Sequence, residues 1–454
     1  MDIFLNKYLL ISIYFIFSLL LIFKLKFKSY SFLTLFIIYT FFTYFLGYIV
    51  FEYFPEYSTL IPLPQKRSNS FFHENYYNYS FFIFLVGYFF FSLPFLLFNK
   101  FNLEIINNSI QEHQINKIIE KYFLIIFSSF LLLNYISYKI RNDYIVGVPY
   151  GTPKNKIAEY SWYTFDYLTI IILIYIIFFG LKSNKHFYRF ISAISVIIYG
   201  FTTAILGWKS GSIWALIIVI HLVFIIHYFY KKQKKIKILF LIFVILTLVP
   251  AVFILSDNLR HDRSFVENIT YDKIKSKIEL LISSSFTMNN FLYVYNRATG
   301  ISPLFVTVAY EDPNKENNIY FYDNLFKRGT YQPETYFSCN VLKYVCPPNF
   351  GSYAPTGWST FYIYNRVYGV IIGFFVLGLI SVFIENVFIN LKNKILFLPL
   401  FTSTYAMSFP AMIFEGTITF YFKRHVLSLF LAFTVFLLFI LLIKRLIHRL
   451  EIKL

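Results

Sequence analysis

Residues 361–384 read FYIYNRVYGVIIGFFVLGLISVFI, an apolar and aromatic run in which Arg366 is the one charged side chain. A run of this length is sufficient to cross the hydrocarbon core of a membrane as a helix. Comparable runs recur along the chain, which is only 14% charged, against about 25% in a typical soluble domain. The sequence therefore predicts an all-α polytopic integral membrane protein.

The apolar runs predict about eleven transmembrane helices. Their expected ranges are 5–23, 30–51, 79–98, 121–138, 162–181, 188–207, 211–230, 238–256, 361–384, 395–413 and 425–443. The first run is too long for the apolar part of a cleavable signal peptide and continues into a second run, so we expect it to remain as a spanning helix.

A polar segment, residues 257–360, separates the eighth predicted span from the ninth. It divides the chain into helices 1–8 (residues 1–256), a large loop, and helices 9–11 with a basic tail (residues 361–454). Within the loop, KIKSKIELLISSSF (Lys273–Phe286) places its isoleucines and leucines on one helical face. This predicts an amphipathic helix that lies in the lipid headgroup layer or packs on the rest of the loop.

The distribution of positive charge predicts the orientation. The net charge of +18 lies largely in short clusters beside the apolar runs, which is typical of topology signals and argues against a nucleic-acid partner. If the tail KRLIHRLEIK (444–453) is cytoplasmic, the cytoplasmic turns hold more basic residues than the short outer segments. The amino terminus and the large loop are then expected outside a bacterial inner (plasma) membrane.

Both cysteines of the chain, Cys339 and Cys346, lie in the large loop. In an oxidising compartment they can form a disulfide, and the alternative is two free thiols. We expect no metal site, because two cysteines without a nearby histidine cannot complete a zinc site.

Cations gather at the predicted outer ends of the helices and in the loop. In or beside lipid, several cations that face one cavity would form a receptor for a phosphate-rich anion. Any one of them could instead extend to the headgroups or form a structural ion pair. The candidates for anion binding are Lys209, Arg260, Arg263, Arg297, Arg366 and Arg424.

Few acids lie near these cations. A general base must lie within hydrogen-bond reach of the hydroxyl that it activates. The candidates are Asp262 and His261 in LRHDR, and Glu415, for which an ion pair with the nearby Lys423 and Arg424 is the competing interpretation.

Three stretches and the architecture resemble the O-antigen polymerase family of bacterial envelopes, also called oligosaccharide repeat-unit polymerases. ILGWKSGSIWALII (205–218) is similar to the family's helix junction with a Ser-Arg pair, with Lys209 in place of the arginine. GWSTFYIYNRVYGVIIGFFVLGLI (357–380) resembles the helix entry after the large loop. GTITFYFKRHVLSLFLAF (416–433) resembles the late helix that carries an arginine.

The resemblance implies a metal-independent glycosyltransferase without a cofactor. Its donor and acceptor would be undecaprenyl-diphosphate-linked oligosaccharides at the outer face of the membrane, and a chain-length regulator protein is a possible further partner. The cations would hold the leaving diphosphate, and Asp262 or His261 would orient or deprotonate the acceptor hydroxyl. The aromatic residues of the loop, including Tyr331, Tyr336, Phe337, Tyr353 and Trp358, could stack on sugars or simply pack.

Three alternatives compete with the polymerase. A membrane glycosyltransferase that uses lipid-monophosphate donors usually keeps an acidic pair in its first outer loop, where this chain has only the scattered Glu52, Glu56 and Glu74. An O-antigen ligase shares the architecture. A transporter or lipid flippase would place ionisable groups near the middle of the membrane and keep its loops short. The concentration of charge at the outer helix ends and the one long loop favour the polymerase.

The orientation predicts that Cys339 is accessible from outside the cell. After mild reduction, a membrane-impermeant maleimide added to intact spheroplasts should label Cys339 in a Cys346→Ser variant. Labelling that requires lysis of the spheroplasts would contradict the predicted topology.

Overall fold

The computed structural model describes residues 6–24, 31–53, 74–98, 120, 122–144, 156–183, 185–205, 209–230, 279, 304–305, 307–308, 356–391, 394–410, 413 and 426–438. Within these ranges the secondary structure is helical and contains no strand. The elements are α1 (Lys7–Lys24), α2 (Phe32–Thr40), η2 (Phe41–Phe45), α3 (Leu46–Tyr53), α4 (Glu74–Phe98), α6 (Phe123–Tyr144), α7 (Lys156–Lys182), α8 (His186–Ile205), α9 (Lys209–Tyr230), α17 (Gly357–Asn390), α18 (Lys394–Ser403) and η6 (Thr404–Ser408), where η marks a π-helix.

Among the described residues, five helical segments are long and apolar enough to cross a membrane. They are Phe32–Val50, Tyr77–Phe98, Phe123–Arg141, Ser161–Lys182 and Gly357–Asn390. In lipid, the N–H and C=O groups of the backbone must pair with one another, and a helix pairs them all within one segment. Apolar segments of this length therefore form helices. The fold class expected from the sequence is therefore supported as an α-helical membrane protein.

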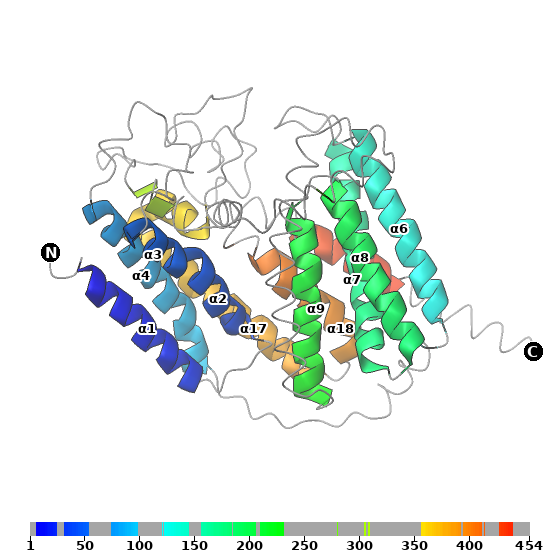
Figure 1. Ribbon diagram of the computed structural model, residues 1–454, viewed down its shortest axis with the longest axis horizontal. Helices are drawn as coiled ribbons and strands as arrows, with labels where there is room; N and C mark the ends of the chain where they lie inside the picture. Colours follow the sequence, from blue (N-terminus) through cyan, green and yellow to red (C-terminus); the bar gives the residue numbers. More distant parts are fainter. Residues whose placement is uncertain are drawn as a thin grey trace, which may run out of the picture.

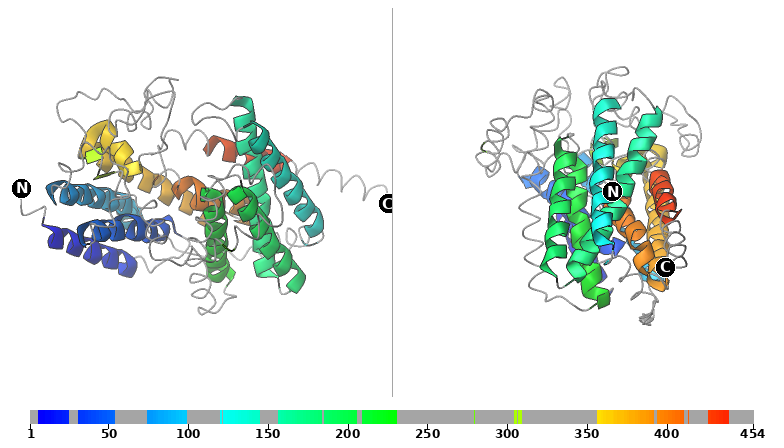
Figure 2. Two further views of the ribbon diagram at one scale, coloured as in Figure 1. Left: turned by 45° about the horizontal axis from the view of Figure 1, so that its top comes forward. Right: turned by 90° about the vertical axis from the view of Figure 1, so that its right-hand side faces the viewer.

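The helices form two groups that lie side by side along the longest axis of the molecule (Figure 1). The first group contains α1, α2, α3, α4 and α17, and the second contains α6, α7, α8 and α9. The left view of Figure 2 shows the same separation, with the end of α17 and α18 between the groups. The upper face is the face at the top of Figure 1. At this face α6 and α8 end, and α4, α7 and α9 begin.

The second group is built around α7. In its apolar stretch 83% of the residues are buried, against 22% in that of α6. Helix α7 contacts α6, α8, α9 and α18, whereas α6 leaves Leu124, Leu132 and Tyr135 exposed. Exposed apolar side chains of this kind are suited to contact with lipid.

The first group depends on a close approach of α4 to α17. A Cβ added at Gly87 of α4 would collide with the indole of Trp358, and one at Gly378 of α17 would collide with the carbonyl of Phe91. Small residues at helix crossings are how membrane helices bring their backbones together. The Trp358 side chain, fully buried, donates from Nε1 to the Phe84 carbonyl at 3.2 Å.

Helix α17 is two helices joined by a reversal. The backbone leaves helical geometry at Asn365 and Arg366. Trp358 packs against Phe374 with a ring-centroid distance of 4.0 Å, although sixteen residues of continuous helix would separate them by about 24 Å. The short helix before Asn365 therefore folds back on the long helix after Arg366.

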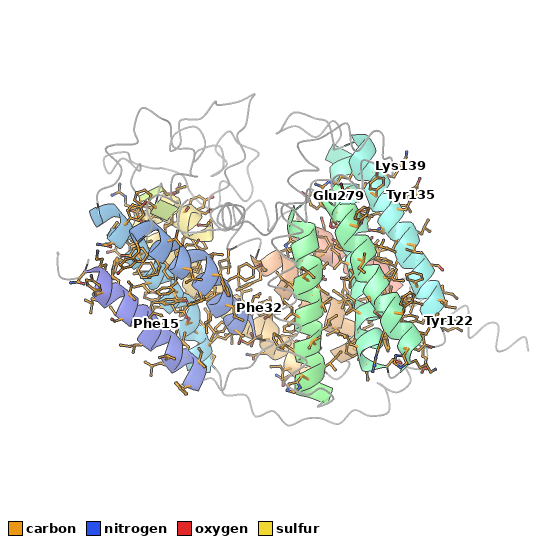
Figure 3. All side chains as sticks on the ribbon, viewed as in Figure 1. Phe15, Phe32, Tyr122, Tyr135, Lys139 and Glu279 are labelled. Atoms are coloured by element: carbon orange, nitrogen blue, oxygen red, sulfur yellow. The ribbon has the colours of Figure 1, made fainter. Side chains whose placement is uncertain are left out.

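Helix α18 and the π-helix η6 connect the two groups. Phe32, at the start of α2, contacts the rings of Phe401, Tyr405 and Phe409. Figure 3 labels Phe32 at the end of α2 that faces the second group. On the other side, His221 of α9 stacks on Tyr405 with a centroid distance of 3.6 Å and an interplanar angle of 7°.

The long described helices fall on ranges predicted from the apolar runs. The predicted span 238–256 and most of the loop 257–360 lie outside the described residues, as does the amphipathic helix Lys273–Phe286 apart from Glu279. The total of eleven spans and the large outer loop therefore stay predictions. The ninth span was expected at 361–384, whereas α17 begins at Gly357. The difference arises because α17 includes the short helix that precedes the reversal.

Gly87→Ala should lower the stability of the first group by roughly 1–3 kcal/mol, because the added methyl group overpacks against Trp358. The measurement is thermal unfolding of the purified protein in detergent. Gly200→Ala is the matched control, since a Cβ there meets nothing within 4 Å. Equal melting temperatures for the two variants would contradict the close approach.

Candidate functional site

The upper face carries an arginine in a strained turn. Arg366 has φ 50° and ψ −133°, and it is the one non-glycine residue with positive φ among the described residues. Such a conformation costs about 1–3 kcal/mol and persists only where the surrounding structure enforces it. The Arg366 side chain and that of its neighbour Asn365 are exposed.

Packing on both sides of the turn enforces this conformation. Positions 369 and 373 are glycines, and a Cβ at either would collide with Phe361, the first with its carbonyl and the second with its ring. Phe361 also meets Phe374 edge to face at 5.4 Å. At the other end of the short helix, Thr356 caps the backbone N–H of Ser359 at 3.4 Å. The two helices thus lie against one another and leave Arg366 at the tip.

A guanidinium at such a tip is suited to binding anions. Arginine presents a planar set of donors that matches phosphate oxygens two at a time, which lysine cannot do. The exposed turn places this group at the upper face, beside the region where charged headgroups would lie if the predicted spans cross a membrane.

Lys209 is the first residue of α9 and therefore also begins at the upper face. Helix α9 belongs to the second helix group, whereas the turn that carries Arg366 belongs to the first (Figure 1). The remaining predicted site residues lie outside the described residues: Arg260, His261, Asp262, Arg263, Arg297, Arg424, Glu415, Cys339 and Cys346.

Trp358 lies in the core rather than at a sugar-binding surface. Its indole packs against Tyr44 at 4.4 Å and Phe374 at 4.0 Å, and it is fully buried. Of the two interpretations of this residue, stacking on a sugar or packing, the structure supports packing.

A buried charge cluster on α6, α7 and α8 is not among the site residues predicted from the sequence. Asp166, in the upper half of α7, is 3% exposed, and its carboxylate interacts electrostatically with Arg141 on α6. The Tyr199 hydroxyl of α8 lies 3.5 Å from both carboxylate oxygens. The Arg141 guanidinium also lies over the Trp162 ring at 4.6 Å. The signal was a lone aspartate inside the apolar run YTFDYLTI, a position where ionisable residues usually have a function.

A second buried carboxylate, Glu385, is likewise not among the predicted site residues. It accepts hydrogen bonds from the Ser31 hydroxyl at 2.7 Å and from the backbone N–H of Phe32. Its negative charge therefore caps the first turn of α2, where the helix dipole favours an anion. This contact ties the lower part of α17 to the start of α2.

The described residues contain no group of three or more histidine, cysteine, aspartate or glutamate side chains that could hold a metal ion. Comparisons of the chain with protein-family models, with curated proteins and with solved structures find no match.

Arg366→Gly should be more stable than Arg366→Ala by about 1 kcal/mol, because both variants remove the same side-chain contacts and only glycine adopts positive φ without steric cost. At Tyr368, an exposed position in the regular helix that follows, the order should reverse, with Tyr368→Gly roughly 1 kcal/mol less stable than Tyr368→Ala. Thermal unfolding in detergent compares the variants of each pair. An Arg366→Gly variant no more stable than Arg366→Ala would show that the turn is not strained.

Proposed function

We propose that the protein is a polymerase of undecaprenyl-diphosphate-linked oligosaccharide repeat units, a glycosyltransferase of the bacterial inner membrane. A hydroxyl of one lipid-linked saccharide attacks the anomeric carbon of the sugar linked to diphosphate on the other. The new glycosidic bond forms, the bond from sugar to diphosphate breaks, and the lipid diphosphate leaves with its electron pair. The hydroxyl proton passes to a base.

The observation that carries this proposal is the strained Arg366 at the tip of the α17 reversal. Strain at an exposed turn is typical of residues held in position for function. The chemistry requires fixed positive charge beside a leaving diphosphate, since such preorganised charge stabilises the transition state. The resemblance of residues 357–380 to the polymerase family covers the same turn.

The proposal includes the predicted topology. Eleven spans, an outer amino terminus and an outer loop 257–360 would place Arg366 and Lys209 at the extracytoplasmic face. Arg260, Arg263, Arg297 and Arg424 would join them as ligands of the two diphosphates, and Asp262, His261 or Glu415 would serve the acceptor. An O-antigen ligase, which transfers a finished glycan to a lipid A core sugar, uses the same leaving group and is the closest competing function.

A transporter or lipid flippase is the second candidate. The buried ionisable groups Asp166 and Glu385 favour it, because charges inside membrane spans commonly line the path of a substrate or ion. The Arg366 turn favours the polymerase, because a transporter has no need for a strained arginine outside its path.

Arg366→Gly should abolish most polymer, with at least about a tenfold loss, since a hydrogen bond to a charged group contributes roughly 1.5–3 kcal/mol. Arg366→Lys should retain part of the activity, because it keeps the charge and loses the two-donor geometry. The measurement is the length distribution of surface glycan on a gel, with the variant in place of the chromosomal gene.

Lys185→Ala is the matched control, because it removes an exposed cation from the opposite face and should leave the glycan unchanged. A strain that lacks the gene should show single repeats on the acceptor. Bare core in that strain would identify a ligase, and loss of all lipid-linked repeats at the outer face would identify a flippase. Polymer of normal length with Arg366→Gly would exclude Arg366 from the site.

A further inference from the structure

A column of buried ionisable and hydroxyl side chains crosses the middle of the molecule. We call it the polar column, and it consists of Asp166, Tyr167, Ser408, Tyr405, His221 and Glu385. These residues come from α7, η6, α9 and α17, which are in contact through α18. None of them belongs to the proposed anion site at Arg366.

The upper end of the column is Asp166. The groups that face its carboxylate are Arg141 and Ser137 from α6 and Tyr199 from α8. Tyr167, the next residue on α7, is fully buried and lies within electrostatic reach of both Asp166 and Tyr199.

The middle of the column is formed by η6. The Tyr167 side chain lies beside Ser408, at the end of this π-helix. Within the same π-helix is Tyr405, whose ring stacks on His221 at 3.6 Å. Widened turns of this kind are found frequently at functional sites, because they disturb the regular hydrogen bonding of the helix.

The lower end of the column is Glu385. Its carboxylate lies within electrostatic reach of the Tyr405 hydroxyl and accepts a hydrogen bond from Ser31 at 2.7 Å. At 1.5 Å per residue, Glu385 lies about 8 Å along the helix from the lower end of α17 at Asn390. By the same measure Asp166 lies about 8 Å from Ser161, the upper limit of its apolar segment.

The column therefore extends from the upper to the lower third of the apolar helices. Helix α18, which contacts all the elements that carry the column, has two further buried hydroxyls, Thr402 Oγ1 and Ser403 Oγ, and neither has a hydrogen-bond partner among the described residues. Buried hydroxyls of this kind are usually satisfied by water molecules, which would join the separate side chains into a continuous chain of hydrogen bonds.

We propose that the polar column is a proton path across the membrane, with Asp166 as the group that takes up and releases the proton at the upper end. A proton that arrives at Asp166 neutralises its carboxylate. Along the hydroxyls and water, each oxygen accepts a proton from one neighbour and donates its own proton to the next. Only O–H bonds break and form in this relay. Chains of acidic, histidine and hydroxyl groups serve this purpose in membrane pumps and transporters.

The competing explanation is that Asp166 and Arg141 form an ion pair that only attaches α6 to α7. Removal of one partner of a buried pair is destabilising in either case, because the remaining charge is left without compensation. The double variant Asp166→Asn with Arg141→Gln removes both charges together and retains side chains of similar size. If the pair is only structural, the double variant should conduct protons at the wild-type rate. If the column is a proton path, the double variant should not conduct protons.

The test uses the full-length protein in liposomes that contain a pH-sensitive dye, with an imposed pH gradient and valinomycin with potassium to balance charge. The wild type should acidify the lumen at least about tenfold faster than protein-free liposomes, and Asp166→Asn and the double variant should fall to the protein-free rate. Asp166→Glu, which keeps the carboxyl group, should retain part of the flux.

Glu120→Gln is the matched control, because it removes a carboxylate that pairs with Lys185 at 2.6 Å outside the column. The hydrogen bond and charge of Glu120 raise the pKa of Lys185, and both side chains are exposed, so the flux should equal that of the wild type. Wild-type flux no faster than that of protein-free liposomes, or wild-type flux in the double variant, would overturn the proposal. Because the readout is proton movement, failure here leaves the glycan experiment at Arg366 unaffected.

Discussion

The contact of Trp358 with the bare backbone of α4 at Gly87 is the constraint on which the first helix group depends. The indole fills the space that a side chain at position 87 would occupy and donates its N–H to the Phe84 carbonyl. With Trp358 held there, the short helix of α17 must run beside the long helix rather than continue it. The reversal at Asn365 and Arg366 and the strained backbone at Arg366 follow from that arrangement.

Both groups combine apolar packing with hydrogen bonds between helices. The first is packed by aromatic rings, such as the stack of Tyr14 on Phe45 at 4.7 Å, and has hydrogen bonds such as that from Trp358 Nε1 to the Phe84 carbonyl at 3.2 Å. The second combines apolar contacts with polar ones inside the span, such as the Asp166 cluster and the hydrogen bond from Ser192 to the Ile176 carbonyl at 2.7 Å. Membrane helices gain no hydrophobic energy from leaving lipid, so close packing and hydrogen bonds supply the association energy in both groups.

The sequence predicts the helices well because the apolar runs that form them are local. It could not predict the reversal of α17, because its causes are distributed over Gly87, Trp358, Phe361, Gly369 and Gly373, and no short pattern connects them. Arg366 was predicted as a cation of the site, but its turn was not. Asp166 was detectable as an acid in an apolar run, whereas its partners Arg141 and Tyr199 are identifiable only once α6 and α8 are in place.

The π-helix η6 has a consequence for the spacing of residues along the chain. In a regular α-helix, residues four apart are rotated by about 40° past a full turn, whereas a π-turn closes over more residues. Phe401, Tyr405 and Phe409 are spaced four apart and all contact one ring, that of Phe32. An insertion or deletion between Phe401 and Phe409 would therefore rotate at least one of these rings away from Phe32, whereas an exchange of side chains at the other positions would leave the three contacts in place.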